Sequence, residues 1–298
     1  KEYIMGKEIQ DAISLVTIGL PFFNNSETLK FTLRSIMKQS FTNWKLILIN
    51  DGSTDNSDQS ISREILDDPR VTYINDKTNK GLVFRLNQIA GLCPTPYLAR
   101  MHADDMIVPD RIETQLNYLL KHPEVDLVDS ALYTIDDDNQ VVGVRGLEAI
   151  SYLPEQIIVR SMLNHATIIG KASWFKNNKY NGDYLRAEDY ELWCRTFSFS
   201  NFKRIERPLY IVREGKVNVN NYILTMRTCR KVLKVYGPKY LNSAQVKKEI
   251  FKTYIKGSLY SITGFLGIQH ILPKSRNSRL VEQDRINVQS MIAGIIGE

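Results

Sequence analysis

Short apolar segments alternate with amphipathic stretches through the first hundred residues of this chain, and this alternation limits the folds open to it. The apolar segments have the length of strands and occupy residues 14–20, 45–49, 71–74 and 97–101. The stretches between them repeat apolar residues at helical spacing. Strands that alternate with helices in this way form a mostly parallel sheet covered by helices on both faces. The sequence therefore predicts an α/β fold with such a sheet at its centre.

A polar or turn-forming segment follows each of the four predicted strands. These segments contain, in chain order, Pro21, Asp51, Asn79 and Asp104. Parallel strands place their carboxyl ends at one edge of the sheet, and open α/β folds bind their ligands at that edge. We therefore expect the four residues to converge on a single site.

The fourth predicted strand leads into two adjacent carboxylates, Asp104 and Asp105. Carboxylate oxygens at the edge of a sheet suit Mg²⁺ or Mn²⁺ together with a bound diphosphate. The alternative interpretation is a solvated turn or a helix cap. A second acidic run, residues 136–138, is interpreted as a solvated turn because Asp and the following Asn139 are ordinary turn residues.

The composition excludes several classes of protein. Hydrophobic residues make up 43% of the 298 residues, which is enough for a large globular core. The first ten residues lack the apolar run of a secretory signal. Lysines such as Lys252, or glycines, interrupt the longest apolar runs, so no transmembrane helix is expected. Cys93, Cys194 and Cys229 lack the spacing of a disulfide framework, which predicts buried free thiols and a reducing, cytoplasmic setting.

The net charge of +6 is concentrated in the last quarter of the chain. Residues 218–298 hold 13 Lys and Arg against 4 Asp and Glu, whereas residues 1–217 hold 26 against 29. Within residues 221–298, basic residues interleave with apolar ones at helical spacing. Such a stretch can lie on an anionic membrane surface, or it can pack on the rest of the protein and expose a basic face. No motif beyond charge points to nucleic acid as a partner.

Five segments of the sequence, taken together, resemble the family 2 inverting glycosyltransferases, which have the GT-A fold. The resemblance extends over residues 14–213. It implies a GT-A catalytic domain over residues 1–217 and a basic helical C-terminal region over residues 218–298. The five segments are residues 18–24 (Ile-Gly-Leu-Pro-Phe-Phe-Asn), 50–55 (Asn-Asp-Gly-Ser-Thr-Asp), 79–82 (Asn-Lys-Gly-Leu), 99–105 (Ala-Arg-Met-His-Ala-Asp-Asp) and 188–193 (Glu-Asp-Tyr-Glu-Leu-Trp).

The donor side is the part of the site that would bind the nucleotide sugar. There, the resemblance implies that Asp104 is the direct ligand of a Mn²⁺ or Mg²⁺ ion, which would neutralise the diphosphate of the nucleotide sugar. It implies that Asp51 accepts a hydrogen bond from the nucleobase. Phe23 is expected either to stack on the base or to lie in the core. The residues expected to bind the nucleotide sugar are Pro21, Phe22, Phe23, Asp51, Asn79, His102, Ala103 and Asp104.

On the acceptor side, the resemblance identifies Asp189 as the general base, which takes the proton of the attacking hydroxyl. The alternative role is a first-turn carboxylate, and a helix N-terminus is expected to keep the pKa of Asp189 low. Glu188 is the second candidate base. The resemblance also places His165 and Arg213 near the diphosphate or the acceptor, and arginine suits phosphate geometry.

The resemblance implies a metal-dependent inverting enzyme that moves a hexosyl or N-acetylhexosaminyl group from a nucleotide sugar, with a UDP-sugar favoured. The expected acceptor is a hydroxyl of a glycan or lipid-linked molecule in bacterial surface polysaccharide assembly, such as capsule or lipopolysaccharide. The expected location is cytoplasmic, or peripheral at the inner face of the membrane. Because Asn50, His102 and Gly215 depart from the family pattern, the alternative is a non-catalytic homologue that binds nucleotide sugar or scaffolds an assembly complex.

Overall fold

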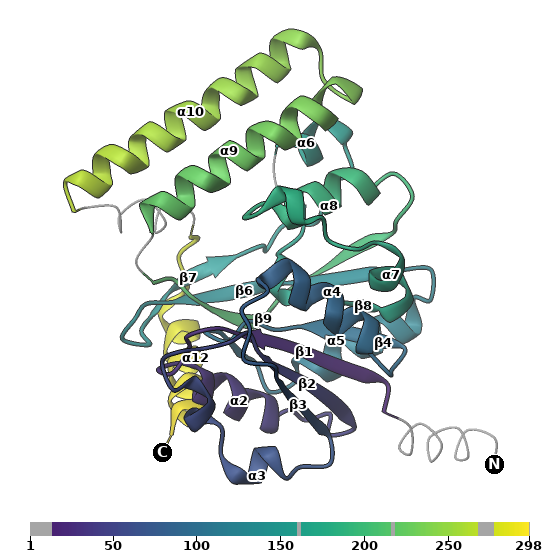
Figure 1. The fold of residues 1–298 in the computed structure, drawn as a ribbon, viewed down its shortest axis with the longest axis vertical. Helices are drawn as coiled ribbons and strands as arrows, with labels where there is room; N and C mark the ends of the chain where they lie inside the picture. The colour runs from purple at the N-terminus through teal and green to yellow at the C-terminus, as the bar shows by residue number, and fades with distance from the viewer. Residues whose placement is uncertain (1–13, 160–161, 216–217, 268–276, 298) are drawn as a thin grey trace.

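The computed structural model describes residues 14–159, 162–215, 218–267 and 277–297 of the chain. A nine-stranded sheet forms its centre, and helices cover both faces of this sheet (Figure 1). The strands follow the order β3-β2-β1-β4-β8-β6-β9-β5, and β7 pairs with β6 outside this path. The expected α/β architecture is therefore confirmed.

The amino-terminal half of the sheet is fully parallel. Its strands are β1 (Val16–Phe22), β2 (Trp44–Asn50), β3 (Val71–Asn75) and β4 (Tyr97–Arg100). β1 lies between β2 and β4, with Ile18 beside both Leu46 and Ala99. Every residue of β1 is buried. Helices on both faces of the sheet explain why the sequence of this strand is apolar or small throughout.

Beyond β4 the sheet combines parallel and antiparallel pairs. Its strands there are β5 (Met106–Ile107), β6 (Leu127–Ile135), β7 (Val141–Arg145), β8 (Ile169–Lys171) and β9 (Phe202–Arg213). β8 runs antiparallel to both β4 and β6, whereas β9 runs parallel to β6. Ile169, at the start of β8, pairs with Ala99 near the end of β4. The reversal therefore brings the residues that precede β8 to the edge where the parallel strands end.

One apolar core lies between the sheet and the helices α2 (Leu29–Met37), α3 (Arg63–Leu66) and α5 (Arg111–Lys121). Leu33 and Ile36 of α2 are fully buried in it beside β1 and β2. These residues recur at helical spacing, so the helix presents one apolar face to the sheet. The amphipathic pattern of the sequence accounts for this layer.

The second core covers the opposite face of the sheet and is rich in aromatic side chains. It is formed by α4 (Leu82–Leu92), α6 (Pro154–Val159), α7 (Ala172–Asn177) and α8 (Glu188–Thr196). Trp193 of α8 lies at its centre, with ring centroids 5.7 Å from Phe202 and 6.2 Å from Trp174. A Cβ atom on Gly19 would lie 2.5 Å from Ile89 of α4, so this glycine allows the helix to approach β1 closely.

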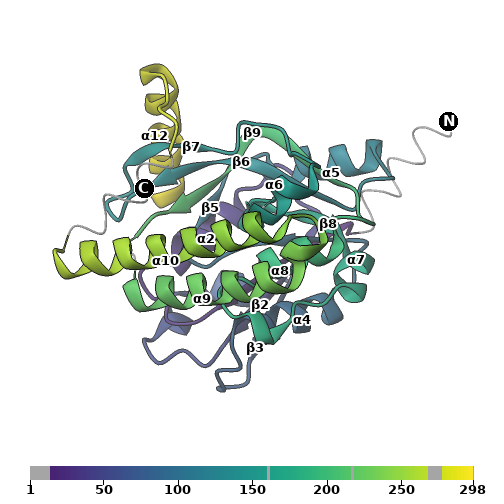
Figure 2. The same cartoon turned by 90° about the horizontal axis from the view of Figure 1, so that it is seen from above.

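The C-terminal region packs at two separate places. α9 (Val219–Tyr236) and α10 (Ser243–Phe265) form a hairpin that packs on α8, whereas α12 (Glu282–Ile296) packs beside β5, β7 and α2 (Figures 1 and 2). Single 3₁₀ turns lie at η1 (Ser57–Ser60), η2 (His165–Thr167), η3 (Gly182–Tyr184) and η4 (Gly237–Lys239).

Two expectations about membranes and thiols can be compared with this fold. Within the described ranges, the helices lack the combination of length and apolar character that crossing a bilayer requires. Cys93 and Cys194 are buried free thiols, whereas Cys229 is only half-buried and also free. The prediction of free cysteines is therefore confirmed, with Cys229 less buried than expected.

We expect Trp193→Ala to lower the free energy of unfolding by about 3–5 kcal/mol, because it removes a fully buried indole from the centre of the aromatic core. Urea denaturation monitored by far-ultraviolet circular dichroism measures this loss. The matched control is Phe199→Ala, since Phe199 follows the same helix but is 66% exposed, and its effect should stay within about 0.5 kcal/mol. Equal losses for the two variants would contradict the packing described here.

Candidate active site

A cavity of about 510 Å³ opens at the carboxyl edge of the parallel strands. Its wall comes from the end of β1, the loops after β1, β2, β3 and β4, and the start of α4, together with Arg186 from the segment before α8. The expected convergence of these loops is therefore observed. The cavity contains all eight residues expected on the donor side, which are Pro21, Phe22, Phe23, Asp51, Asn79, His102, Ala103 and Asp104.

Asp51 holds the wall of this cavity together through a buried ion pair with Arg85 of α4. Its Oδ1 accepts hydrogen bonds from Arg85 Nε at 2.6 Å and from the Lys80 backbone N–H at 2.8 Å, and its Oδ2 accepts from the Gly81 backbone N–H at 2.9 Å. The Arg85 side chain is fully buried and also binds Asp76. Arg85, and after it Lys80, lower the pKa of Asp76. Sequence analysis missed Arg85 because its position on an apolar helix face carries no motif.

Two residues of the first loops settle questions that the sequence left open. Phe23 is 43% exposed on the cavity wall, so it does not lie in the core. Asn50 stands where the family has an aspartate, and its side-chain oxygen accepts a hydrogen bond from the Ser53 backbone N–H at 2.8 Å. An amide oxygen closes this local turn as a carboxylate would. The Asn50 departure is therefore compatible with the shape of the loop.

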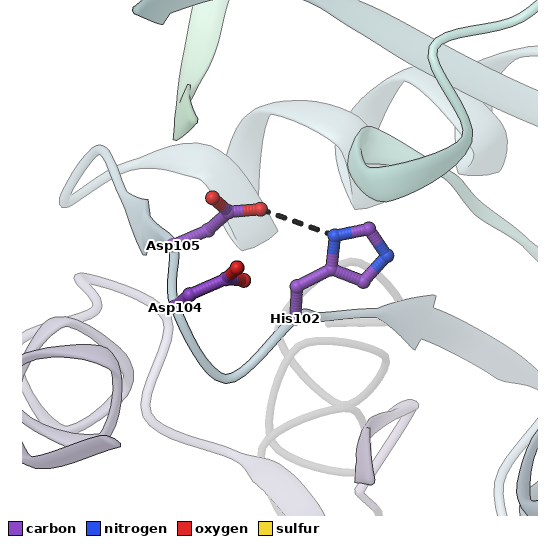
Figure 3. Close-up of side chains that lie close together, drawn as sticks. All are labelled: His102, Asp104 and Asp105. Atoms are coloured by element: carbon purple, nitrogen blue, oxygen red, sulfur yellow. Dashed lines mark hydrogen bonds and ion pairs between the residues drawn. The ribbon is translucent and has the colours of Figure 1, made fainter. Parts of the chain in front are cut away.

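His102, Asp104 and Asp105 lie together after β4, with one ligand atom of each within 4.8 Å of the others (Figure 3). Arg100 Nη2 lies 3.1 Å from His102 Nε2, and His102 Nδ1 lies 3.2 Å from Asp105 Oδ2. Because arginine can only donate, His102 accepts at Nε2 and donates from Nδ1. Both of its ring nitrogens are therefore engaged within the protein.

Asp105 organises the loop from a buried position. Its Oδ1 accepts a hydrogen bond from the Arg213 backbone N–H at 2.9 Å, and its backbone oxygen accepts one from Thr32 Oγ1 at 2.7 Å. The side chain of Asp104, by contrast, is exposed to the cavity. Partial burial, and after it the charge of Asp105, raise the pKa of Asp104. A divalent cation would relieve this repulsion.

The residues present fit a Mg²⁺ or Mn²⁺ ion. Asp104 offers a hard oxygen ligand at a cavity large enough for a nucleotide, and such ions are commonly held by one or two carboxylates together with substrate phosphates. Asp105 and His102 would hold the Asp104 loop in place through the hydrogen bonds described above.

A second cavity, of about 410 Å³, lies between α6, α8, α9 and α10. Asp189, in the first turn of α8, lines this second cavity, and Arg186 lines both cavities. Arg186 has a φ of +68°, a conformation that non-glycine residues adopt only when their surroundings hold them there. Sequence analysis missed Arg186 because this backbone conformation leaves no pattern in the sequence.

The environment of Asp189 differs from the expectation. Burial, and after it the charge of Glu188, raise the pKa of Asp189 to about 6. The expectation of a low pKa at the helix N-terminus is therefore wrong, because these two effects outweigh the stabilisation by backbone N–H groups. Glu188 itself is buried at the start of α8.

His165 lies beside Asp189, because the reversed strand β8 brings it to this edge. Its Nδ1 is 3.9 Å from Asp189 Oδ2, and its Nε2 is 2.8 Å from the Tyr180 hydroxyl. Burial, and after it the nearby Arg100, lower the pKa of His165 well below its ordinary value. His165 is therefore neutral at pH 7, and its approach to Asp189 is not an ion pair.

The guanidinium of Arg213 binds the turn between β6 and β7, while its backbone N–H donates to Asp105. Its guanidinium donates hydrogen bonds to the Asp136 backbone oxygen at 3.0 Å and to Asn139 Oδ1 at 2.5 Å, at the turn between β6 and β7. Asp136 Oδ1 closes the same turn by accepting from backbone N–H groups of Asp138 and Gln140, so the solvated-turn interpretation of residues 136–138 holds. Contact of Arg213 with a diphosphate stays a prediction.

Comparison with known proteins agrees with this geometry. Residues 17–204 match the family model described as glycosyl transferase family 2. "Putative glycosyltransferase EpsE" of Bacillus subtilis (strain 168) is 30% identical over 234 residues, which cover 73% of this chain and 82% of that protein. "Putative colanic acid biosynthesis glycosyl transferase WcaA" of Escherichia coli (strain K12) is 26% identical over 186 residues, which cover 61% of this chain and 65% of that protein.

The fold is similar to that of a solved structure as well. The crystal structure of S. aureus TarS 1-349 in complex with UDP matches with a TM-score of 0.58 and 15% identity, covering 80% of this chain and 70% of that chain. The fold is thus of the GT-A type, with a cavity of about 510 Å³ at the carboxyl edge of its parallel strands. The chain belongs to glycosyl transferase family 2.

We expect Arg85→Met to lower the free energy of unfolding by about 3–5 kcal/mol, because it leaves the buried carboxylate of Asp51 without its charge partner. Thermal and urea denaturation both measure this effect. Lys80→Met is the matched control, since it removes only a partly exposed partner of Asp76 and should change the denaturation midpoint little. The buried-pair assignment fails if Arg85→Met is as stable as Lys80→Met.

Proposed function

We propose that this chain is an inverting glycosyltransferase that transfers a hexosyl or N-acetylhexosaminyl group from a nucleoside-diphosphate sugar to an acceptor hydroxyl. The observation that carries the proposal is the arrangement of two cavities that share Arg186. Asp104 lines the first cavity and Asp189 lines the second. A donor in the first cavity and an acceptor in the second would bring the anomeric carbon between the two carboxylates.

The first cavity is proposed to hold the donor, with a UDP-sugar favoured. Phe23 offers an exposed aromatic face for the base, and Asp51 has a carboxylate at the cavity wall. The solved TarS structure that shares this fold contains UDP. These observations support a pyrimidine nucleotide at the edge formed by β1 and β2.

The Asp104 carboxylate is proposed to hold Mn²⁺ or Mg²⁺ with the donor diphosphate. Such an ion, when bound, neutralises the negative charge that develops on the leaving nucleoside diphosphate. Asp105 keeps the Asp104 loop in place by accepting from the Arg213 backbone and from His102. Arg186 can contact the same diphosphate from the opposite wall of the cavity.

Asp189 is proposed to be the general base. With a pKa of about 6, most of its carboxylate is ionised near pH 7 and yet remains a useful proton acceptor. The acceptor oxygen forms a bond to the anomeric carbon as the carbon–oxygen bond to the diphosphate breaks, and the hydroxyl proton passes to Asp189. Attack from the face opposite the diphosphate inverts the configuration.

The acceptor is proposed to be a hydroxyl of a glycan or lipid-linked molecule, used in bacterial surface polysaccharide assembly. The relative WcaA carries colanic acid biosynthesis in its name, which supports this setting. Assembly of this kind from a nucleotide sugar would take place in the cytoplasm, with docking at the inner face of the membrane through residues 221–298. The competing function, a non-catalytic homologue that binds nucleotide sugar or scaffolds an assembly complex, would bind UDP without releasing it from any UDP-sugar.

We expect UDP with Mn²⁺ to raise the melting temperature of the wild-type chain, because a ligand at one hundred times its Kd adds about 2.7 kcal/mol to stability. Asp104→Ala should lose the metal-dependent part of this shift. Differential scanning fluorimetry without and with Mn²⁺ measures it, and Asp67→Ala serves as an exposed control far from the cavity. A full metal-dependent shift in Asp104→Ala would remove Asp104 as the ligand.

We expect kcat/KM for UDP release from the preferred UDP-sugar to fall about tenfold per pH unit below pH 6, since Asp189 must be ionised to act as a base. Glu188→Gln removes the like charge that raises this pKa, so the acid limb should move to lower pH. Glu124→Gln, at an exposed site, should leave the profile unchanged. Asp189→Asn should abolish turnover but keep UDP binding, and an active Asp189→Asn variant would rule out the base assignment.

A further inference from the structure

The outer face of α10 carries large apolar side chains that are 44–92% exposed within the described part of the chain. α10 is the outermost helix of its end of the molecule, with α9 and α8 between it and the sheet (Figures 1 and 2). Its inward side holds the buried residues Val246, Thr253, Tyr260 and Thr263. The exposed set, called the outer stripe, comprises Phe251, Tyr254, Ile255, Leu259, Ile262, Phe265 and Leu266.

The spacing of these residues makes the outer stripe continuous. At 100° per residue, its members fall within about 140° of the helix circumference and extend for roughly 24 Å along the axis. Phe251 is 62% exposed and Phe265 is 92% exposed. Soluble proteins rarely leave such a contiguous apolar surface in water unless it binds a partner.

The hairpin of α9 and α10, which carries the outer stripe, is strongly basic. Between residues 219 and 265 the sequence holds nine Lys and Arg but a single acidic residue, Glu249. Lys252 is the partner of that residue, with Nζ 2.6 Å from Glu249 Oε1, so most of the positive charge is not neutralised locally. The basic residues are Arg227, Arg230, Lys231, Lys234, Lys239, Lys247, Lys248, Lys252 and Lys256.

We propose that the outer stripe inserts into the interface of an anionic lipid bilayer. A bilayer of this kind offers apolar chains to the stripe and negative headgroups to the lysines and arginines of the same hairpin. A second copy of the chain would bring two strongly basic surfaces together, which like charge disfavours. The stripe is also an outward ridge ending in Phe265, and a ridge enters a fluid interface without needing a complementary groove on a partner.

Docking in this way would orient the acceptor side of the protein, a consequence that rests on the proposed function. Lys252 and Lys256 line the cavity that contains Asp189, and they belong to the same helix as the outer stripe. The docked surface and the cavity therefore share an edge. An acceptor anchored in the bilayer could reach Asp189 while its lipid part stays in the membrane.

The test is cosedimentation of the full chain with vesicles of equal parts phosphatidylglycerol and phosphatidylcholine, and with vesicles of phosphatidylcholine alone. We expect binding to the anionic vesicles that weakens at high salt. The combined variant Phe251→Ser, Ile262→Ser and Phe265→Ser should bind at least about tenfold more weakly. Phe199→Ser, which changes an exposed phenylalanine away from α10, should bind as the wild type does.

The vesicle result, the oligomeric state and the folding of the triple variant together decide the proposal. Absence of wild-type binding to anionic vesicles, or equal binding by the triple variant, overturns the proposal. Sedimentation velocity tests the competing occupant, because a wild-type dimer that becomes a monomer in the triple variant would assign the stripe to a second copy. Circular dichroism of the triple variant shows whether it folds. Its UDP release, measured without vesicles, separates a failure of docking from a failure of the proposed enzyme activity.

Discussion

The parallel pairing of β1 with β2 and β4 is the constraint on which the rest of the structure depends. It brings the loops after β1, β2 and β4 to one edge, where together with the loop after β3 they line a single cavity. Close packing of α4 on Gly19 then positions Arg85, which pairs with the carboxylate of Asp51 in the wall of this cavity. The cavity therefore depends on backbone pairing and helix packing as much as on the residues that line it.

The site contains two kinds of carboxylate: those whose charge is paired within the protein, and those that face a cavity. Asp51 is paired with Arg85, and Asp105 accepts hydrogen bonds from His102 and a backbone N–H, so their charges are compensated within the protein. Asp104 and Asp189 lie at cavity walls, and both have raised pKa values because burial and a neighbouring carboxylate disfavour their charge. Such an arrangement concentrates unsatisfied negative charge at the two positions proposed to meet a cation and a proton.

The C-terminal region contributes to the protein in two ways. α9 and α10 complete the wall of the Asp189 cavity, so this cavity does not exist without residues beyond the family match. α12 packs at the β5 end of the sheet, where Val288 and Ile292 bury apolar surface of β5 and β7. The basic charge of this region is concentrated in the hairpin, because residues 219–265 hold nine Lys and Arg against the single acidic Glu249, whereas α12 holds Arg285 against Glu282 and Asp284.

The sequence by itself determined the first four strands, their intervening helices and the common edge of the loops after them, because apolar periodicity and turn residues are local signals. It also indicated Asp104 and Asp189 through motif resemblance. Only the tertiary structure decided that β8 runs antiparallel to β4 and so brings His165 beside Asp189. It also decided that Arg85 is buried against Asp51, and that the Arg213 guanidinium binds the turn between β6 and β7. Non-local strand pairing sets these positions, and burial beside Glu188 sets the pKa of Asp189, neither of which a local pattern records.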